Sequence, residues 1–352
     1  MPALRWDLYC RVVDNLGDAG VCWRLARELA ARGDAVRLVI DDAAPLRLIA
    51  AQGCPGVEVL PWPGPNAPGD VVVEAFGCAL PPPALDALAR RDPAPVWINL
   101  EYLSAEPYVE RSHGLPSPQR LAAGAWVRKW FYFPGFTART GGLLREAGLL
   151  ERRAAFDRAA WLAAQGIAWQ PHEHVVVLFC YDNPAVDDLL DDLAQAPTLL
   201  LLTPGPAQRQ AGGSGGRDRP GLRLHRLPWL AQPEFDHLLW SADLNFVRGE
   251  DSLVRAIWAG APFVWQIYPQ QDGAQGPKLE AMLTTLALDA DAAALWRAWN
   301  GLRPGPWPGL PAPAARDAWR ARTEAARARL AADADLATQL RTFVAGKQAP
   351  GC

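Results

Sequence analysis

The stretch NFVRGEDSLVRAIWAGAPFVWQIYPQ, residues 245–270, contains the pattern that decides the fold. It predicts a buried strand, a charged turn, and then a helix from about Ser252. A glycine-containing turn that leads into a helix offers backbone N–H groups and the positive end of the helix dipole. Arg248 adds a planar cation that matches phosphate oxygens. The turn therefore suits a diphosphate, while Glu250 and Asp251 need another role: capping the helix, holding sugar hydroxyls, or chemistry.

Short apolar runs alternate with helical segments along the rest of the chain. Such runs are typical of strands in parallel sheets that are covered on both faces. The first set lies at 8–13, 35–40, 71–76, 96–100 and 130–133, and the second at 175–180, 199–203, 222–227, 244–247 and 263–268. Each set predicts one α/β unit.

The length of 352 residues favours two domains. We expect the boundary near 165–172, where a helix-like segment over 143–165 gives way to glycine and proline. This divides the chain into an N-terminal domain over 1–168 and a C-terminal domain over 169–335.

The tail is expected to return to the first domain. Residues 313–345 read as helix, and Leu336, Leu340 and Val344 fall on one stripe. That end should therefore dock, and we join 336–352 to the N-terminal domain. The glycine-rich segment 211–221 predicts a loop within the C-terminal domain.

Composition excludes several classes of function. The net charge is −3 and the pI is about 6.0, so no basic balance argues for nucleic acid. No segment approaches the roughly 20 apolar residues of a membrane helix, and the N-terminus shows no cleavable apolar region. We expect a cytoplasmic protein. The six cysteines lack C-x-x-C spacing, and we interpret them as reduced packing residues that form neither a metal site nor a disulfide.

Ligands of doubly wound folds bind at the carboxyl ends of the strands. The first strand leads into DNLGDAGVCWRLARELAARG, residues 14–33. Asp14 stands at the strand end, Gly17 permits a tight turn, and Asp18 occupies the place of a helix N-cap. From spacing alone, a cap worth ~1 kcal/mol is slightly favoured over catalysis. Two carboxylates at a strand end can instead bind a cation or accept a proton.

The segments 10–30 and 245–270 together resemble the EarP family, bacterial protein-arginine rhamnosyltransferases that act on translation elongation factor P. Further blocks match at 74–78 (EAFGC), 99–110 (NLEYLSAEPYVE), 113–118 (HGLPSP), 129–136 (KWFYFPGF) and 238–252 (LLWSADLNFVRGEDS). The resemblance covers most of the chain. It is least clear at 211–217 and beyond about residue 285.

The resemblance implies a GT-B fold, with two Rossmann-like domains facing across a cleft. It implies transfer of L-rhamnose from dTDP-β-L-rhamnose to a guanidine nitrogen of one arginine of elongation factor P, with inversion at the anomeric carbon. Neither a metal nor a cofactor is expected. The modified factor relieves ribosome stalling at polyproline. The nucleotide is expected on the C-terminal domain, and the acceptor and the base on the N-terminal one.

The family's acceptor-side residues map onto the first loop. Asp18 matches the general base, and Asp14 matches a second acid beside it. Asn15 and Gly17 lie in the loop that lines the sugar and the diphosphate. Because arginine is protonated at physiological pH, we interpret Asp18 as the proton acceptor and Asp14 as the group that orients the guanidinium.

Three residues match contacts to the nucleotide base. Tyr181 matches an aromatic that packs against it, and Gln232 and Phe235 match residues that read and stack the thymine. Spacing alone would make Tyr181 a core residue at a strand end and Phe235 the inner face of a helix over 233–241.

The turn of the opening stretch matches the family's diphosphate contacts. Arg248 matches a phosphate contact, Glu250 an essential acid, and Asp251 and Ser252 contacts at the helix start. The alternatives are an ion pair of Arg248 with Glu250 or Asp251, and plain capping by Asp251 and Ser252.

Three other functions stay open. One is a GT-B enzyme with another nucleotide sugar or acceptor. A nicotinamide-dependent oxidoreductase is a second, although the first turn lacks the glycines of G-x-G-x-x-G. The third is a protein that binds elongation factor P without modifying it, which would not need Asp14, Asp18 and Glu250 together.

Overall fold

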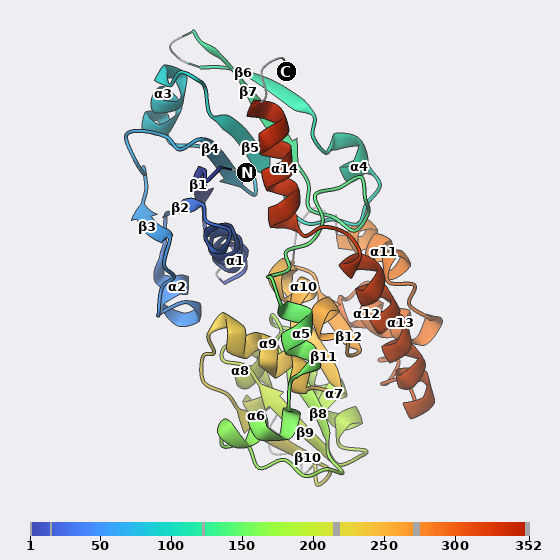
Figure 1. Cartoon of the computed structure of the whole chain (residues 1–352). Helices are drawn as coiled ribbons and strands as arrows, with labels where there is room; N and C mark the ends of the chain where they lie inside the picture. Colours follow the sequence, from blue (N-terminus) through green and yellow to red (C-terminus); the bar gives the residue numbers. More distant parts are fainter. Residues whose placement is uncertain (1, 15, 122–123, 214–218, 270–274, 349–352) are drawn as a thin grey trace. The chain divides into compact units, whose positions relative to one another are not determined.

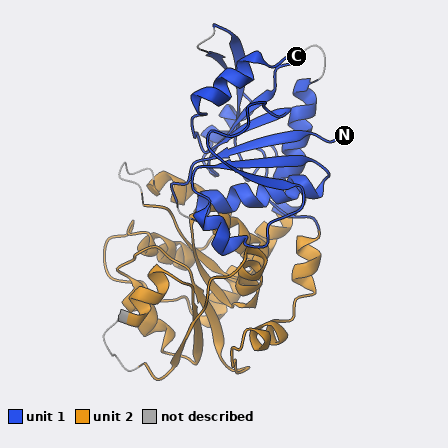
Figure 2. Ribbon diagram, turned by 90° about the vertical axis from the view of Figure 1, so that its left-hand side faces the viewer, with its two compact units in different colours: residues 1–147, 330–352 blue, residues 148–329 orange. Residues whose placement is uncertain are grey.

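The computed structural model describes residues 2–14, 16–121, 124–213, 219–269 and 275–348. The chain forms two compact units, coloured separately in Figure 2: residues 1–147 with 330–352 (unit 1), and residues 148–329 (unit 2). In the described part of the chain, no helix combines the length and the apolar character that crossing a membrane requires.

Unit 1 is built on a seven-stranded sheet of order β3-β2-β1-β4-β5-β7-β6 (Figure 1). Its strands pair in parallel, except that β6 is antiparallel to β7. The elements are β1 (Arg5–Cys10), α1 (Gly17–Ala31), β2 (Ala35–Ile40), α2 (Ala44–Ile49), β3 (Val57–Pro61), β4 (Val71–Ala75), α3 (Pro82–Arg90), β5 (Val96–Leu100), α4 (Tyr108–Ser112), β6 (Pro116–Arg120), β7 (Trp126–Tyr132) and α14 (Leu336–Gln348).

The buried strands of unit 1 were predicted, and the edge strands were not. β2, β4 and β5 agree with the predicted runs to within one residue. The first run was placed too late, because β1 ends at Cys10 and residues 11–16 lead into α1. β3 and β6 were missed because both are partly exposed edge strands, and β6 contains Pro116 and Pro118, which read as loop.

Unit 2 is built on a five-stranded parallel sheet of order β10-β9-β8-β11-β12. All five predicted strands are present. The elements are α5 (Leu149–Ala154), α6 (Arg158–Ala164), β8 (His174–Leu178), α7 (Val186–Leu193), β9 (Thr198–Leu202), α8 (Pro206–Gly213), β10 (Leu222–Arg226), α9 (Gln232–Ser241), β11 (Leu244–Arg248), α10 (Gly249–Ala259), β12 (Phe263–Gln266), α11 (Gln275–Thr285), α12 (Ala290–Trp299) and α13 (Pro313–Ala331). Of the loop predicted at 211–221, the first residues belong to α8, and 214–218 lie outside the described residues.

The division between the units falls earlier in the chain than the predicted boundary near 165–172. The segment 143–165 is not one helix, because α5 and α6 are separate and short. Both belong to unit 2. α6 is fixed there by Arg158, whose Nη2 donates to Asp243 Oδ2 at 2.7 Å, and by Trp161, whose Nε1 donates to Glu234 Oε2 at 2.7 Å.

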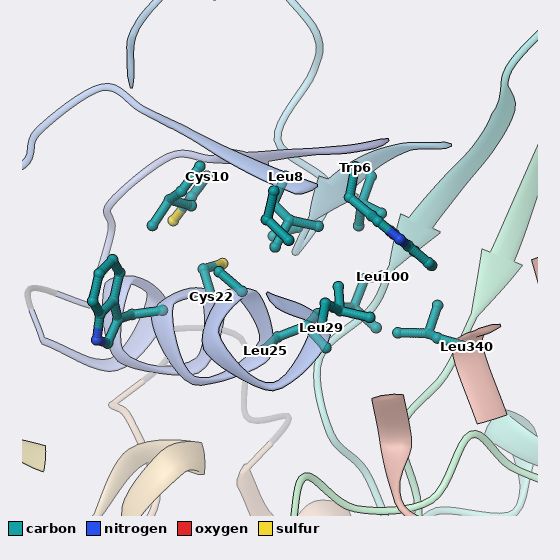
Figure 3. Packing of buried hydrophobic residues seen from close by; sticks show 14 of the residues in the cluster. Trp6, Leu8, Cys10, Cys22, Leu25, Leu29, Leu100 and Leu340 are labelled. Atoms are coloured by element: carbon teal, nitrogen blue, oxygen red, sulfur yellow. The ribbon is translucent and has the colours of Figure 1, made fainter. Parts of the chain in front are cut away.

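The tail forms two helices, α13 and α14, where one continuous helix was predicted. Leu336, Leu340 and Val344 are 2%, 0% and 0% exposed, and they join the hydrophobic core of unit 1. Figure 3 shows Leu340 beside Leu100 and Leu29 in that core. The prediction that this stripe docks is therefore confirmed.

The cysteines agree with the prediction as far as they are described. Cys10, Cys22, Cys78 and Cys180 are free and buried, and Cys54 is free and half-buried. Cys10 and Cys22 pack in the core between β1 and α1 (Figure 3).

Candidate active site

The loop between β1 and α1 is organised around the Asp18 carboxylate. Asp18 is 4% exposed and lies in the first turn of α1. Its Oδ2 accepts the backbone N–H of Val13 at 2.8 Å and that of Asp14 at 2.9 Å. Both donors precede the helix, and Leu16 occupies the N-cap position without a side-chain cap. The interpretation of Asp18 as a plain N-cap is therefore wrong, because its carboxylate fixes the preceding loop instead.

Gly17 makes room for the second acid. Its N–H donates to the Asp14 carbonyl at 2.6 Å, which closes the turn. A Cβ added at Gly17 would lie 2.6 Å from Asp14 Oδ2. Asp14 and Asp18 are thus brought together by the fold, whereas Asn15 lies outside the described residues.

An aromatic pair lies at the same edge of the sheet, after β4 and β5. Phe76 follows β4 with φ +58°, a left-handed conformation that costs a non-glycine residue roughly 1–2 kcal/mol. Its N–H donates to the Leu100 carbonyl at 2.6 Å. Its ring stacks on Tyr102, with centroids 4.6 Å apart and 16° between the planes. Tyr102 stays 40% exposed, so the pair presents an aromatic face.

Glu101 adds a third carboxylate at this edge. Its Oε1 accepts Asn99 Nδ2 at 2.6 Å, and Asn99 Oδ1 accepts the Gly77 N–H at 3.1 Å. Burial raises the pKa of Glu101 above its ordinary value, although Asn99 and Lys129 oppose the rise. Phe76, Glu101 and Tyr102 carry no local motif that predicts a role for them. Only their placement at the ends of neighbouring parallel strands identifies them.

In unit 2, Arg248 is held against two aromatic rings. Its Cζ lies 4.3 Å from the ring centroid of Tyr181 and 4.7 Å from that of Phe179. Arg248 ends β11, and both rings follow β8, the neighbouring strand. Arg248 forms no ion pair with any described residue. The alternative of an ion pair with Glu250 or Asp251 is therefore wrong.

The helix after Arg248 begins at Gly249, three residues earlier than predicted, because Gly249 has φ +65° and turns the chain directly out of β11. The Ser252 hydroxyl donates to the Arg248 carbonyl and accepts the Arg248 N–H at 3.1 Å. Trp265 Nε1 donates to the Gly249 carbonyl at 2.7 Å. Ser252 therefore ties the strand end to the helix, and no side chain caps the N-terminus of α10 from Arg248.

Glu250 pairs with a residue that the sequence reasoning missed. Lys278, from α11, lies with Nζ 2.8 Å from Glu250 Oε1. The two side chains are 17% and 18% exposed, so the pair is partly buried. Lys278 also lies 6.0 Å from the ring centroid of Trp265. No local motif links two residues so far apart in sequence.

The three residues matched to the base lie in the same unit. The Tyr181 N–H donates to Gln266 Oε1 at 2.8 Å, which fixes that residue after β8. Phe235 meets Phe179 edge-on, with centroids 5.3 Å apart. Gln232 begins α9 and is 4% exposed. Phe179 thus connects Phe235 to Arg248, and it too was missed.

Unit 1 therefore presents carboxylates and an aromatic pair at one sheet edge, and unit 2 presents a cation, aromatic rings and the N-terminus of α10 at another. The first set suits a cationic guanidinium, which carboxylates bind and aromatic faces stack. The second set suits a nucleoside diphosphate, because helix N-termini and arginine both bind phosphate.

The comparisons with known proteins agree with this chemistry. The family model described as elongation factor P rhamnosyltransferase EarP matches residues 6–345. A protein-arginine rhamnosyltransferase of Pseudomonas putida is 46% identical over 377 residues, covering 96% of this chain and 98% of that protein. The solved structure of EarP, described with arginine glycosylation of elongation factor P, is 35% identical, has a TM-score of 0.66, and covers 97% of this chain and 99% of its own.

A calicheamicin glycosyltransferase shares the fold at 16% identity and a TM-score of 0.50, covering 99% of this chain and 100% of its own. The predicted GT-B fold, built from two parallel-sheet α/β units, is confirmed. With the family model covering nearly the whole chain, this protein belongs to the EarP family of glycosyltransferases.

Proposed function

We propose that this protein transfers L-rhamnose from dTDP-β-L-rhamnose to a guanidine nitrogen of one arginine in elongation factor P, with inversion at the anomeric carbon. The family match and the names of its relatives support the arginine acceptor and the sugar. The observation that carries the proposal is the pair Asp14 and Asp18 at the end of β1, with Asp18 oriented by two backbone N–H groups.

A guanidinium is a poor nucleophile, so the carboxylates on the acceptor side have to activate it. Asp14 orients the cation and localises its charge away from the reacting nitrogen. Asp18 accepts the proton as the new bond forms. Glu101 and the stacked ring of Tyr102 provide a third carboxylate and a flat surface for the same side chain.

On the donor side, Tyr181, Gln232 and Phe235 hold the thymine. Arg248 and the N–H groups at the start of α10 bind the diphosphate. Asp251 and Ser252 belong to the same turn. Arg248 and the helix dipole would stabilise the charge that develops on the departing diphosphate, so the residues of this chain supply that role without a metal.

The reaction is a single displacement. The guanidine nitrogen forms a bond to the anomeric carbon, the bond from that carbon to the diphosphate oxygen breaks, and dTDP departs with the electron pair. The nitrogen loses one proton to Asp18. Glu250 pairs with Lys278, and in this proposal it contacts the donor sugar or orders Arg248.

Intact mass spectrometry tests the proposal directly. Elongation factor P from the same bacterium is incubated with this protein and dTDP-β-L-rhamnose, with Asp18→Asn in parallel. The expected result is a gain of one deoxyhexose that slows by about 10²–10⁴-fold with the variant. Binding of dTDP should be unchanged in the variant. No gain with the wild type would overturn the proposal, and near-normal turnover with Asp18→Asn would remove Asp18 from its role.

A further inference from the structure

The β6–β7 hairpin of unit 1 lies in a segment with an unusual charge pattern. Between Glu110 and Glu146 the sequence contains six cations and no acid, in a chain whose net charge is −3. The helix that packs beside the hairpin, α14, also contains no acid. Such segregation of charge marks a surface for an anionic partner.

The register of the hairpin places the exposed cations and tryptophans on one face. Arg120 pairs with Trp126 across the strands, and Pro118 pairs with Arg128. Trp126, Arg128 and Trp130 alternate along β7, so they point to the same side of the sheet.

Lys347 of α14 completes this face. Its Nζ lies 3.8 Å from the ring centroid of Trp130, and Arg128 Cζ lies 5.3 Å from the same ring. Figure 1 shows the C-terminal end of α14 next to the hairpin. We name this surface the hairpin patch: Arg120, Trp126, Arg128, Trp130 and Lys347.

The cations of the patch are available for a partner. Arg120, Arg128 and Lys347 form no ion pair with any described residue. By contrast, Lys129, on the opposite face of β7, pairs with Glu74 at 2.9 Å. Trp126 is 69% exposed and offers a large apolar surface to solvent. Exposed tryptophan and arginine are the residues that most often anchor protein interfaces.

We infer that the hairpin patch docks an acidic surface of the acceptor protein. The inference rests on the proposed function, because it assumes that the acceptor is a protein. β7 belongs to the sheet that carries Asp14 and Asp18, and its seven residues span roughly 20 Å. A domain of about 100 residues, with a radius of gyration near 13 Å, can reach from the patch to that edge.

Two other modes of recognition fit less well. An added strand on β6 would meet Pro116 and Pro118, which have no N–H to donate. Nucleic acid binders neutralise about six to ten phosphates, whereas the patch offers the three cations Arg120, Arg128 and Lys347. A compact cationic and aromatic patch suits a protein surface better.

The decisive experiment compares Arg120→Glu/Arg128→Glu/Lys347→Glu with wild type in steady-state transfer to elongation factor P, at low and at physiological salt. The expected result is a KM for the acceptor protein raised about tenfold or more, with kcat and dTDP affinity unchanged. Trp126→Ala should raise the same KM. Arg47→Glu, an exposed cation elsewhere on unit 1, is the matched control and should leave it unchanged.

An unchanged KM in the triple variant, or a loss confined to kcat, would overturn the inference. A role in RNA binding would also overturn the inference. In that case the wild type would bind mixed-sequence RNA at physiological salt, and the triple variant would lose this binding while its KM for elongation factor P stayed normal. If the wild type transfers no sugar, the proposed function is wrong, but the docking surface can still be tested. Calorimetry then measures the binding of elongation factor P to the wild type and to the triple variant, and equal affinities would overturn the docking surface.

Discussion

Lys278 in α11 neutralises Glu250 in the first turn of α10, with 2.8 Å between Nζ and Oε1. An anion at a helix N-terminus is favoured by the helix dipole. It would nevertheless repel a diphosphate that binds to the same N–H groups. For the diphosphate site proposed above, Lys278 offsets this repulsion, because its positive charge lies beside the Glu250 carboxylate.

Lys278→Met should therefore weaken donor binding. The variant removes the positive charge 2.8 Å from Glu250, and we expect the Kd for dTDP to rise about tenfold, which corresponds to ~1.4 kcal/mol. Calorimetric titration with dTDP measures this. Glu280→Gln is the control, because Glu280 lies on the same helix in an exposed pair with Arg297, at 2.7 Å. Equal affinities for wild type and Lys278→Met would show that Glu250 does not face the diphosphate.

Arg248 depends on its aromatic support. Its guanidinium lies over Tyr181 and Phe179, and a lysine lacks the planar, delocalised cation that arginine offers to aromatic faces. Arg248→Lys should raise the Kd for dTDP and reduce turnover, although the charge is kept. Tyr181→Phe keeps the ring and should leave the Kd for dTDP and the turnover almost unchanged. Tyr181→Ala removes the ring and should weaken dTDP binding and turnover almost as much as Arg248→Lys does. A neutral Tyr181→Ala would contradict the role of the ring.

The local patterns of the sequence predicted the frame of this protein. Continuous apolar runs identified the buried strands, and the turns at Asp14 and Arg248 were found because each follows such a run. The contacts that were not predicted join residues far apart in the sequence. Lys278 reaches Glu250 from another helix, and Phe179 reaches Arg248 from a neighbouring strand. Neither contact leaves a signal in the spacing of residues.

The start of α1 and the edge strand β6 could not be predicted from the sequence either. Asp18 was placed at an N-cap because capping residues and first-turn acids share the same composition. The structure separates them, since the Asp18 carboxylate accepts N–H groups from the loop before the helix. Similarly, the prolines of β6 read as loop, although an edge strand tolerates them where no N–H is needed.

Gly17 should tolerate no side chain without loss of activity. The Cβ of Gly17→Ala would approach Asp14 Oδ2 to 2.6 Å and push that carboxylate aside. We expect kcat to fall by at least tenfold, because the displaced Asp14 carboxylate no longer orients the guanidinium in the proposed reaction. Gly346→Ala is the matched control, since nothing lies within 4 Å of a Cβ there. Normal kcat in Gly17→Ala would mean that Asp14 can move without consequence.

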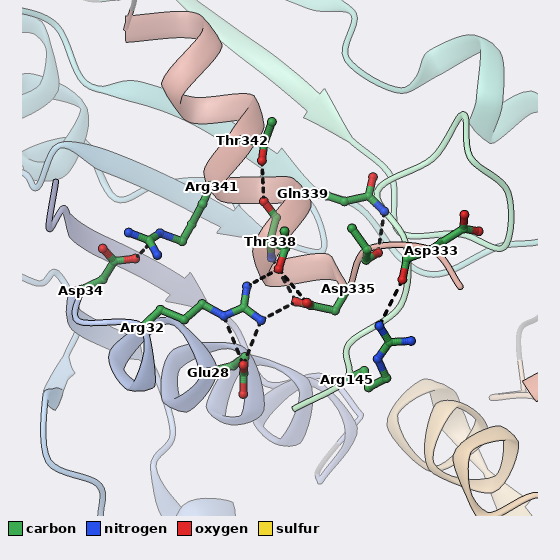
Figure 4. Close-up of polar contacts among 11 residues, drawn as sticks. Glu28, Arg32, Asp34, Arg145, Asp333, Asp335, Thr338, Gln339, Arg341 and Thr342 are labelled. Carbon is green, nitrogen blue, oxygen red and sulfur yellow. Dashed lines mark hydrogen bonds and ion pairs between the residues drawn. The ribbon is translucent and has the colours of Figure 1, made fainter. Parts of the chain in front are cut away.

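α14 is fastened to α1 by a network around Asp335 (Figure 4). Arg32 donates to Asp335 Oδ1 from Nη2 at 2.8 Å and to the Thr338 hydroxyl from Nη1 at 2.6 Å. Burial alone would raise the pKa of Asp335, but hydrogen bonds from Thr338 and Arg32 hold it below the ordinary value of 3.8. The carboxylate is thus charged and satisfied in the folded protein, and this end of the chain depends on it.

Asp335→Asn should destabilise the protein at neutral pH and not at strongly acidic pH. A carboxyl whose pKa is lower in the folded protein than in the unfolded chain stabilises the fold. This stabilisation is complete above the pKa of the unfolded chain and is lost as the pH falls through the pKa of the folded protein. The variant should lose about 2 kcal/mol of unfolding free energy at pH 7, and the difference from wild type should vanish well below pH 3.8. Urea unfolding at both pH values measures it. Asp333→Asn, two residues earlier, removes a carboxylate outside the network and should match wild type at both. A destabilisation of Asp335→Asn that persisted unchanged into strong acid would show that packing of α14, and not the charge of Asp335, is what holds the helix.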